Sequence, residues 1–175
     1  EEALERGEKI AVYGDYDVDG ITATALLITA LERLQAEADW HIPNRFSEGY
    51  GMDSTRVKAL GASGVKLIIT CDCGVSNHDE IKLAMELGMD VVVTDHHTPP
   101  PELPTAAAVL NFKLLPQGHP SRDLPGVGTA FVLARELLCR QGLEAEDLLD
   151  LVALGVIADV VPLLGHSRQL YARGF

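Results

Sequence analysis

The sequence predicts an α/β domain with an open, mostly parallel sheet and helices on both faces. Short apolar runs rich in Val and Ile alternate along the chain with longer segments that have helical spacing. The apolar runs are continuous rather than alternating, which is typical of parallel strands that are buried on both faces. Helices between successive strands are the connections that a parallel sheet requires.

The first third of the chain contains two predicted strand–helix units. KIAVYG (residues 9–14) is a short run of β-formers, and residues 20–35 carry apolar side chains at helical spacing. ADWHIP (residues 38–43) is expected to be the second strand. Residues 53–64 begin with Asp53, a favoured N-cap, and end in glycines, so we expect a short helix there.

The rest of the chain continues the same alternation. VKLIITCD (65–72) and MDVVVTDHH (89–97) are β-branched runs, and residues 77–88 between them are helix formers that end at a glycine. A fifth strand is expected at residues 106–112. The remaining expected helices lie at residues 129–141, 145–156 and 168–175.

Length and charge limit the possible functions. The 175 residues suit one compact domain, and no stretch is long and uncharged enough to span a bilayer, so no membrane association is expected. The net charge of −12 argues against a simple nucleic-acid binder but does not exclude a metal enzyme whose carboxylates are neutralised by cations. Both ends of the chain lie in helix-like segments, so we expect a piece of a longer protein.

The three cysteines, Cys71, Cys73 and Cys139, predict a protein of the reducing cytoplasm. An odd and sparse count does not make a disulfide framework. A structural zinc site needs about four ligands at recognisable spacings, which CDC at residues 71–73 does not supply. We therefore interpret Cys71 and Cys73 as small packing residues at the end of a strand.

Acidic residues and histidines follow three of the predicted strands at the point where each strand ends. These residues are Asp15, Asp17 and Asp19 after the first strand, Asp72 after the third, and Asp95, His96 and His97 after the fourth. Any one of the aspartates is equally well explained as a loop residue or a helix cap. Because ligands bind beyond the carboxyl ends of parallel strands, the three groups together predict one shared site.

Divalent metal is the natural explanation for such a concentration of carboxylates. Like charges packed together repel one another, and bound cations remove that repulsion. Carboxylate oxygens with imidazole nitrogens suit Mg²⁺ or Mn²⁺. The carboxylates outnumber what one ion needs, so two ions that share an aspartate are expected, an arrangement that clamps the attacking and leaving oxygens of a phosphoryl group.

Six stretches of the sequence resemble the DHH phosphoesterase family, whose name comes from the Asp-His-His found here at residues 95–97. The stretches, in the order of the family, are GDYDVDGITATALL, PNRFSEGYGM, ITCDCGVS, VVVTDHH, LPGVGTAFVLARELL and LVALGVIADVVPL. Within the family, the chain is most similar to the bacterial exonucleases that degrade single-stranded DNA from the 5′ end. The resemblance covers most of the chain.

The resemblance implies a set of metal ligands and adds Asp159, which spacing alone would leave as a helix-end aspartate. It implies that one ion is held by Asp19, Asp72, His96 and Asp159, and the other by Asp15, Asp17 and Asp72. Asp95 is implied to orient the histidine ligand. His97 is implied to be either a ligand or a phosphate contact that steadies the leaving oxygen.

The resemblance also implies roles outside the ligand set. Arg45 is expected either to bind a substrate phosphate, with the 5′-terminal phosphate as the candidate, or to be an ordinary surface or ion-paired arginine. The amides of residues 126–129 either hold a phosphate or form a plain helix-entry turn. Cys73 replaces the Asn common in the family at a position that is not an expected ligand.

The implied function is hydrolysis of phosphodiester bonds in single-stranded DNA from the 5′ end, in DNA repair and recombination, by two Mn²⁺ or Mg²⁺ ions. The family's second domain and a nucleic-acid-binding barrel have no counterpart in this sequence, so residues 1–175 are expected to be the catalytic domain alone. Single-stranded DNA, a single-strand-binding protein and a helicase are the implied partners. The alternatives are a phosphodiesterase acting on short oligonucleotides, cyclic dinucleotides or pyrophosphate, and a non-catalytic replication scaffold.

Overall fold

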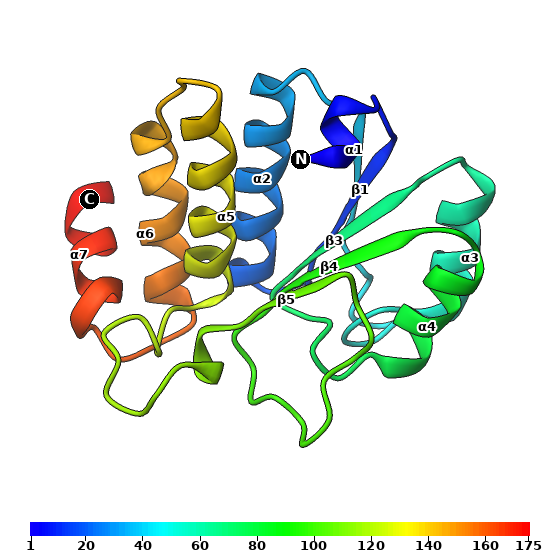
Figure 1. The fold of residues 1–175 in the computed structure, drawn as a ribbon. Coiled ribbons are helices and arrows are strands. Elements are labelled where there is room, and N and C mark those ends of the chain that lie inside the picture. Colours follow the sequence, from blue (N-terminus) through cyan, green and yellow to red (C-terminus); the bar gives the residue numbers. More distant parts are fainter.

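A parallel sheet of five strands forms the centre of the computed structural model, which describes residues 1–175 (Figure 1). The strand order is β2-β1-β3-β4-β5, and every neighbouring pair is parallel. The strands are β1 (Ile10–Tyr13), β2 (Ala38–His41), β3 (Leu67–Cys71), β4 (Asp90–Thr94) and β5 (Ala108–Leu110). All five strands predicted from the sequence are present, and the sheet is wholly rather than mostly parallel.

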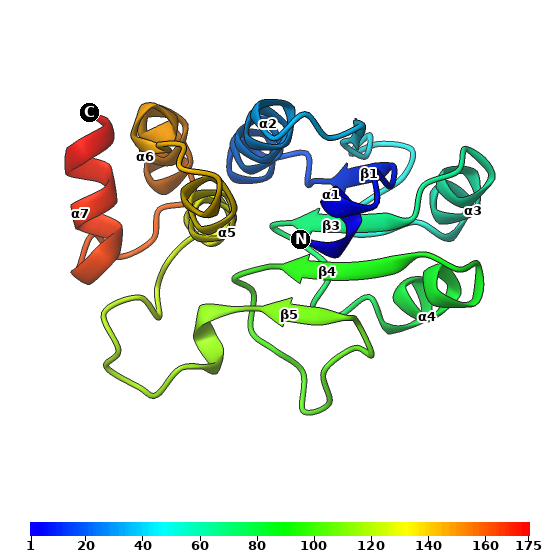
Figure 2. The ribbon, with the colours of Figure 1, turned by 45° about the horizontal axis from the view of Figure 1, so that its top comes forward.

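Helices cover both faces of this sheet, as the sequence predicts (Figure 2). One side carries α3 (Ser54–Ala62) and α4 (His78–Glu86). The other side carries α2 (Val18–Arg33), α5 (Gly126–Arg140) and α6 (Leu149–Ala158), with α7 (Gly165–Gly174) packed against α6. The short helix α1 (Glu2–Glu5) precedes the first strand, and 3₁₀ turns lie at Phe112–Leu114 and Glu146–Leu148. None of the helices has the length and apolar character needed to cross a membrane.

The register of the sheet brings the carboxyl ends of the central strands to one edge. Tyr13, the last residue of β1, pairs with Thr70, and Cys71, the last residue of β3, pairs with Thr94 at the end of β4. The order also places β1 and β3 side by side, while the connections from them run to opposite sides of the sheet. Ligands of open α/β sheets bind outside the carboxyl ends of the strands at such a switch point.

Two hydrophobic clusters hold the layers together. The cluster between the sheet and α2, α5 and α6 contains 21 buried residues, and the cluster beneath α3 and α4 contains 14. Cys71 belongs to the first cluster and Cys73 to the second, so these two thiols pack in different layers. Both are free, which agrees with their interpretation as packing residues.

The observed helices differ from the predicted ones mainly at their starts. α2 begins at Val18, two residues early, because Asp17 is its N-cap and accepts a hydrogen bond from the Gly20 amide at 3.0 Å. α5 begins at Gly126, three residues before the predicted start at Thr129. Glycines are poor helix formers, so local helix propensity predicts that residues 126–128 lie outside the helix. Hydrogen bonds from the Gly126 and Val127 amides to Asp19 at the sheet edge outweigh this propensity.

Candidate metal centre

The turn after β1 presents two buried carboxylates at the edge of the sheet. Asp15 and Asp19 are 2% and 1% exposed, and Asp17 between them is more accessible. Close packing of this turn requires glycine at its end, because a Cβ atom on Gly20 would lie 2.6 Å from the Asp15 carbonyl oxygen. The sequence GDYDVDG therefore folds into a compact strand-to-helix turn with Asp15 and Asp19 directed inward.

Asp72 follows β3 in a backbone conformation that few non-glycine residues adopt. Its φ is +60°, in the left-handed region, and its amide donates to the Thr94 carbonyl oxygen at 3.0 Å. The side chain is almost fully buried against the start of α5. A backbone strain of this kind is typical of functional sites, where the surrounding structure holds the residue in place.

The Asp95-His96-His97 segment follows β4, and the carboxylate of Asp95 organises it. Asp95 accepts hydrogen bonds from the His96 amide (2.7 Å), the His97 amide (3.0 Å), the Val75 amide (2.9 Å) and His97 Nδ1 (2.8 Å). Burial raises the pKa of Asp95, but the hydrogen bonds from His97 and Val75 outweigh it and hold the pKa below its ordinary value. Asp95 therefore orients the ring of His97 and contacts His96 through its backbone amide.

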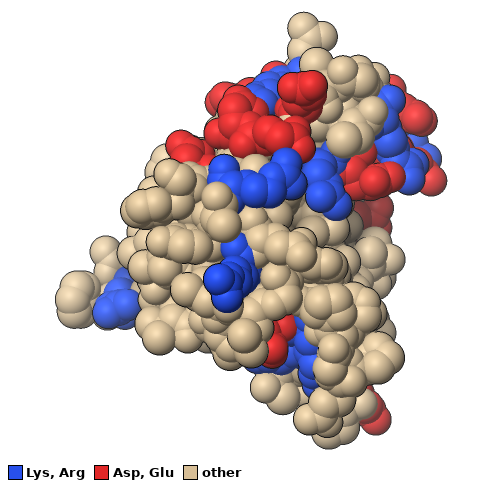
Figure 3. All heavy atoms as spheres, turned by 90° about the vertical axis from the view of Figure 1, so that its left-hand side faces the viewer, with Lys and Arg blue, Asp and Glu red and all other residues tan.

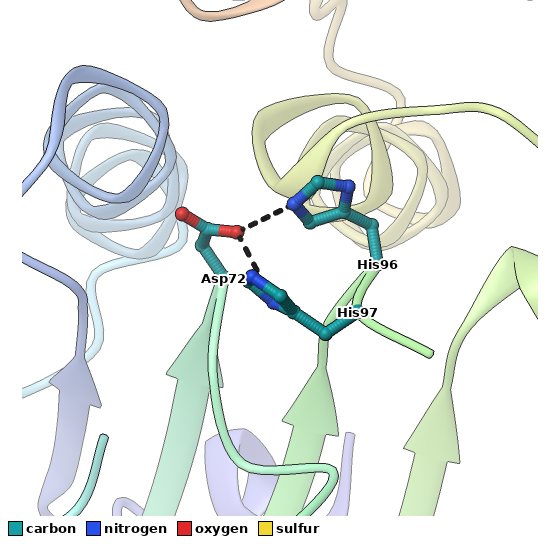
Figure 4. Close-up of side chains that lie close together, drawn as sticks. All are labelled: Asp72, His96 and His97. Carbon is teal, nitrogen blue, oxygen red and sulfur yellow. Dashed lines mark ion pairs between the residues drawn. The ribbon is translucent and has the colours of Figure 1, made fainter. Parts of the chain in front are cut away.

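His96 lies between carboxylates from three different elements. His96 Nε2 is 3.0 Å from Asp72 Oδ1 and 3.7 Å from Asp19 Oδ2, and His96 Nδ1 is 3.6 Å from Asp159 Oδ2. Asp159 reaches this position from the C-cap of α6. Figure 4 shows the rings of His96 and His97 both directed at the Asp72 carboxylate, with His97 Nδ1 3.9 Å from Asp72 Oδ1.

The possible ligand atoms form three overlapping groups in which all atoms lie within 4.8 Å of one another. The groups are Asp15 with Asp17 and Asp72, Asp19 with His96 and Asp159, and Asp72 with His96 and His97. The structure thus brings together every residue that the sequence analysis named as a metal ligand. Asp72 and His96 each occur in two of the three groups, and Asp72 is the residue that links the Asp15–Asp17 pair to the histidines.

The residues of this site fit divalent cations, because two of their buried carboxylate oxygens lack hydrogen-bond donors. Asp15 Oδ1 and Asp72 Oδ1 are buried and accept no hydrogen bond, although His96 Nε2 lies 3.0 Å from Asp72 Oδ1. A buried carboxylate oxygen without a donor carries a large desolvation cost, which a coordinated cation removes. Because the donors are carboxylate oxygens and imidazole nitrogens, they suit Mg²⁺ or Mn²⁺.

Crowding and burial disfavour the charged forms of these carboxylates. Burial, together with repulsion from neighbouring aspartates, raises the pKa of Asp72 to about 10. Burial raises the pKa of Asp19 to about 6 and also raises the pKa values of Asp15 and Asp159. Burial lowers the pKa of His96, so its ring is neutral at pH 7 and available as a ligand.

The metal-free chain is expected to lose stability as the pH rises from about 5 to about 8. The pKa values of Asp19 and Asp72 lie above their ordinary value of 3.8, so over this range the native state binds more protons than the unfolded state. The free energy of unfolding then falls with increasing pH. Urea unfolding in chelator, repeated with saturating Mn²⁺, measures this slope. We expect Mn²⁺ to flatten it, and a metal-free chain that becomes more stable over the range would contradict the account.

The start of α5 contains a contact that the sequence analysis did not find. The amides of Gly126 and Val127 donate to the two Asp19 oxygens at 2.6 and 2.8 Å. These two amides therefore hold a protein carboxylate, and their proposed use for a substrate phosphate is wrong. The signal available in the sequence was the glycine at the helix start, because a Cβ on Gly126 would lie 2.6 Å from the Asp72 Cβ atom.

Arg45 lies outside the three groups, on the exposed loop between β2 and α3. Its guanidinium carbon stands 4.4 Å from the centroid of the Tyr16 ring, and Tyr16 lies between Asp15 and Asp17 in the sequence. Arg45 makes none of the ion pairs in the structure, so the alternative of an ion-paired arginine is not supported. Stacking on Tyr16 keeps the cation close to the turn that carries the first two aspartates.

Residues 9–156 match the DHH family, N-terminal domain. The single-stranded-DNA-specific exonuclease RecJ of Bacillus subtilis is 44% identical over 173 residues, which are 99% of this chain and 22% of that protein. A crystal structure of exonuclease RecJ bound to manganese is 42% identical, with a TM-score of 0.91 over 99% of this chain and 44% of the other. RecJ of Thermus thermophilus, solved with Mn²⁺, is 39% identical, with a TM-score of 0.85 over 99% of this chain and 25% of the other.

These relatives are much longer than residues 1–175. The chain spans 22% to 32% of the RecJ proteins from Bacillus subtilis, Haemophilus influenzae and Escherichia coli, although it aligns over 98–99% of its own length. The crystal structure of CDC45 from Entamoeba histolytica has a TM-score of 0.63 at 15% identity, which is a likeness of fold alone. The family match extends over most of the sequence and confirms the resemblance carried by its motifs, so the chain belongs to the DHH family.

Proposed function

We propose that the chain is the metal-bearing catalytic domain of an exonuclease that hydrolyses single-stranded DNA from the 5′ end. The observation that carries the proposal is a set of three overlapping ligand groups at the carboxyl edge of the sheet, which Asp72 and His96 link to one another. The RecJ relatives are named as single-stranded-DNA-specific exonucleases and align along nearly the whole chain. A scaffold without catalysis has no need of unsatisfied buried carboxylates at this edge.

Two ions, Mn²⁺ or Mg²⁺, account for every member of the ligand groups except His97. We assign one ion to Asp19, Asp72, His96 and Asp159 and the other to Asp15, Asp17 and Asp72, with Asp72 shared. Bound there, such ions supply Lewis-acid activation of the phosphodiester and of the attacking water. Backbone donors hold the Asp19 carboxylate in one orientation, so this ligand is positioned before any ion binds.

We assign His97 a contact with the reacting phosphate. Asp95 accepts the hydrogen bond from His97 Nδ1, which leaves Nε2 with only the Tyr50 hydroxyl near it, at 3.5 Å. The hydrogen bond from His97 to Asp95 raises the pKa of His97, which favours the form that donates from Nε2. We assign His97 to the leaving oxygen and Asp95 to holding its ring.

Arg45 is the candidate for binding a substrate phosphate beside the metals. Its guanidinium is exposed and stacked on Tyr16, so its N–H groups remain available for two parallel hydrogen bonds to phosphate oxygens. We assign Arg45 to the 5′-terminal phosphate. Replacing Arg45 by Ala then reduces the preference for 5′-phosphorylated over 5′-hydroxyl strands.

Most of the DNA is expected to be held outside residues 1–175. The chain has a net charge of −12, and the face that carries α7 shows scattered Lys and Arg side chains with acidic ones among them at its top (Figure 3). DNA-binding surfaces are normally continuous and basic. We propose that a second DHH-associated domain and a nucleic-acid-binding barrel supply that surface in the longer protein. A single-strand-binding protein and a helicase are the proposed partners, and the cytoplasm the proposed location.

An assay of the full-length protein on three kinds of 5′-labelled substrate tests the function. We expect Mn²⁺-dependent degradation of long single strands, slow cleavage of blunt duplexes, and no strong preference for dinucleotides. If dinucleotides are cleaved rapidly while long single strands are not degraded, the protein is a phosphodiesterase of short oligonucleotides and not an exonuclease. Residues 1–175 alone should bind Mn²⁺ but degrade DNA weakly.

A further inference from the structure

Tyr50 connects two residues of the metal centre through a single hydroxyl group. It lies on the loop between β2 and α3, and its Oη atom is 3.2 Å from the Asp72 carbonyl oxygen and 3.0 Å from His97 Nδ1. The ring also packs edge-on against His97, with centroids 5.4 Å apart and an interplanar angle of 66°. None of the roles assigned above involves Tyr50.

The loop on the carboxyl side of Tyr50 is anchored in the protein. Met52 is buried in the cluster beneath α3 and α4, and the Asp53 amide donates to Tyr13 Oη at 3.0 Å. Gly51 has a φ of +82°, and a Cβ atom there would lie 2.9 Å from Asn77 Oδ1. The chain therefore leaves Tyr50 along one fixed path.

The amino side of the loop is held by Glu48. One carboxylate oxygen of Glu48 accepts from the Asn44 amide at 3.0 Å, and the other lies 2.7 Å from His41 Nε2 at the end of β2. Tyr50 thus stands between two tied segments, although its side chain is half exposed. An exposed tyrosine on a free loop would not keep a defined hydrogen-bond geometry.

The hydroxyl also lies 3.5 Å from His97 Nε2, and its two shorter contacts are chemically complementary. Tyr50 donates its proton to the Asp72 carbonyl oxygen, and its oxygen accepts from His97 Nδ1–H, which is shared with Asp95. The contact with the carbonyl oxygen holds the backbone of Asp72, whose φ is +60°, and the contact with Nδ1 limits rotation of the His97 ring. The distance between the Asp72 carboxylate and the His97 ring therefore depends on Tyr50.

We propose that Tyr50 is a positioning residue that fixes the Asp72 carboxylate relative to the His97 ring for metal binding and phosphate contact. The inference rests on the proposed function, because both partners are assigned to that site. Hydrogen-bonding partners of metal ligands typically change metal affinity or activity by about 10- to 100-fold when they are removed. The effect arises without any contact between Tyr50 and the ions.

Tyr50→Phe tests the inference because it removes only the hydroxyl. Tyr171→Phe on α7 is the matched control, since the Tyr171 hydroxyl makes no hydrogen bond in the structure. Calorimetric titration of the chain with Mn²⁺ is expected to show a dissociation constant about tenfold higher for Tyr50→Phe and unchanged for Tyr171→Phe. The thermal unfolding temperatures of the metal-free proteins should agree, because ring packing is kept.

A second readout separates positioning from a general structural role. In the full-length protein, Tyr50→Phe should lower kcat at saturating Mn²⁺ and leave KM for single-stranded DNA unchanged. A Mn²⁺ dissociation constant less than about threefold above that of the wild type would overturn the inference, whatever the unfolding temperature. If the wild-type chain itself binds no Mn²⁺, the proposed function fails, and the two failures are thereby distinguished.

Discussion

Asp72→Asn is expected to reduce the nuclease activity of the full-length protein by more than about 100-fold. Loss of a residue that only supports a ligand already costs up to about this factor, and Asp72 belongs to two of the three ligand groups. An amide cannot supply the negative charge that both ions share. Steady-state rates on single-stranded DNA with saturating Mn²⁺ give the effect directly.

The same variant should fold normally, which separates loss of chemistry from loss of structure. Asn is one of the few non-glycine residues that adopts a positive φ readily, so it suits the conformation of Asp72 at +60°. Asn also removes a buried carboxyl whose pKa is raised to about 10 by burial and neighbouring aspartates. We expect the metal-free variant to be at least as stable as the wild type. Asp79→Asn, an exposed position on α4, is the control.

Retention of more than about a tenth of the wild-type rate in Asp72→Asn would show that Asp72 is not the shared ligand. If the variant loses its activity and also no longer unfolds cooperatively, the carboxylate has a structural role instead. A variant that is folded, stable and inactive is the result that the account predicts. Functional sites commonly trade stability for activity in this way.

Gly126→Ala is expected to reduce activity by about 100-fold through displacement of Asp72. The added Cβ atom would lie 2.6 Å from Asp72 Cβ and 2.7 Å from Asp72 Oδ1, so either the carboxylate or the start of α5 must move. Movement of α5 would also lengthen the hydrogen bond from the Gly126 amide to Asp19. Misplacement by about 1 Å in an active site is enough for a loss of this size.

Gly61→Ala provides the control for Gly126→Ala. Gly61 is also helical, and its added Cβ atom would meet the flexible end of Met89 at 3.3 Å. Helix propensity alone favours alanine over glycine by about 1 kcal/mol, so stability should be kept or raised. The Mn²⁺ affinity of both variants, measured by calorimetry, should fall only for Gly126→Ala. Wild-type affinity and rate in Gly126→Ala would refute the close packing of α5 on Asp72.

The sheet could be predicted because its signals are local. Each strand signal is a Val/Ile run of a few consecutive residues, as in β1, β3 and β4, and the structure contains a strand at each run. The N-cap signal of Asp53 likewise acts on the helix that begins at the next residue. The start of α5 could not be predicted in the same way. Gly126 and Val127 begin a helix against propensity because their amides bind Asp19, more than 100 residues earlier in the chain. A contact at that separation has no local signal.

The site residues also divide into those that the sequence pattern could predict and those that it could not. Convergence of Asp15, Asp72 and His96 followed from parallel strands alone, because their carboxyl ends must share an edge. The inclusion of Asp159 came from family resemblance, since an aspartate at the end of α6 has no special spacing. The contacts of Tyr50 required the folded loop, because Gly49 and Gly51 mark a turn without indicating what the tyrosine between them reaches.

Anomalous diffraction at the manganese edge, from crystals of the chain grown with Mn²⁺, tests the central claim most directly. The account predicts two peaks, one between Asp72 and the residues Asp15 and Asp17, the other between Asp72 and the residues Asp19, His96 and Asp159. The Asp72 carboxylate should contact both ions. A single peak, or peaks that do not share Asp72, would contradict the account.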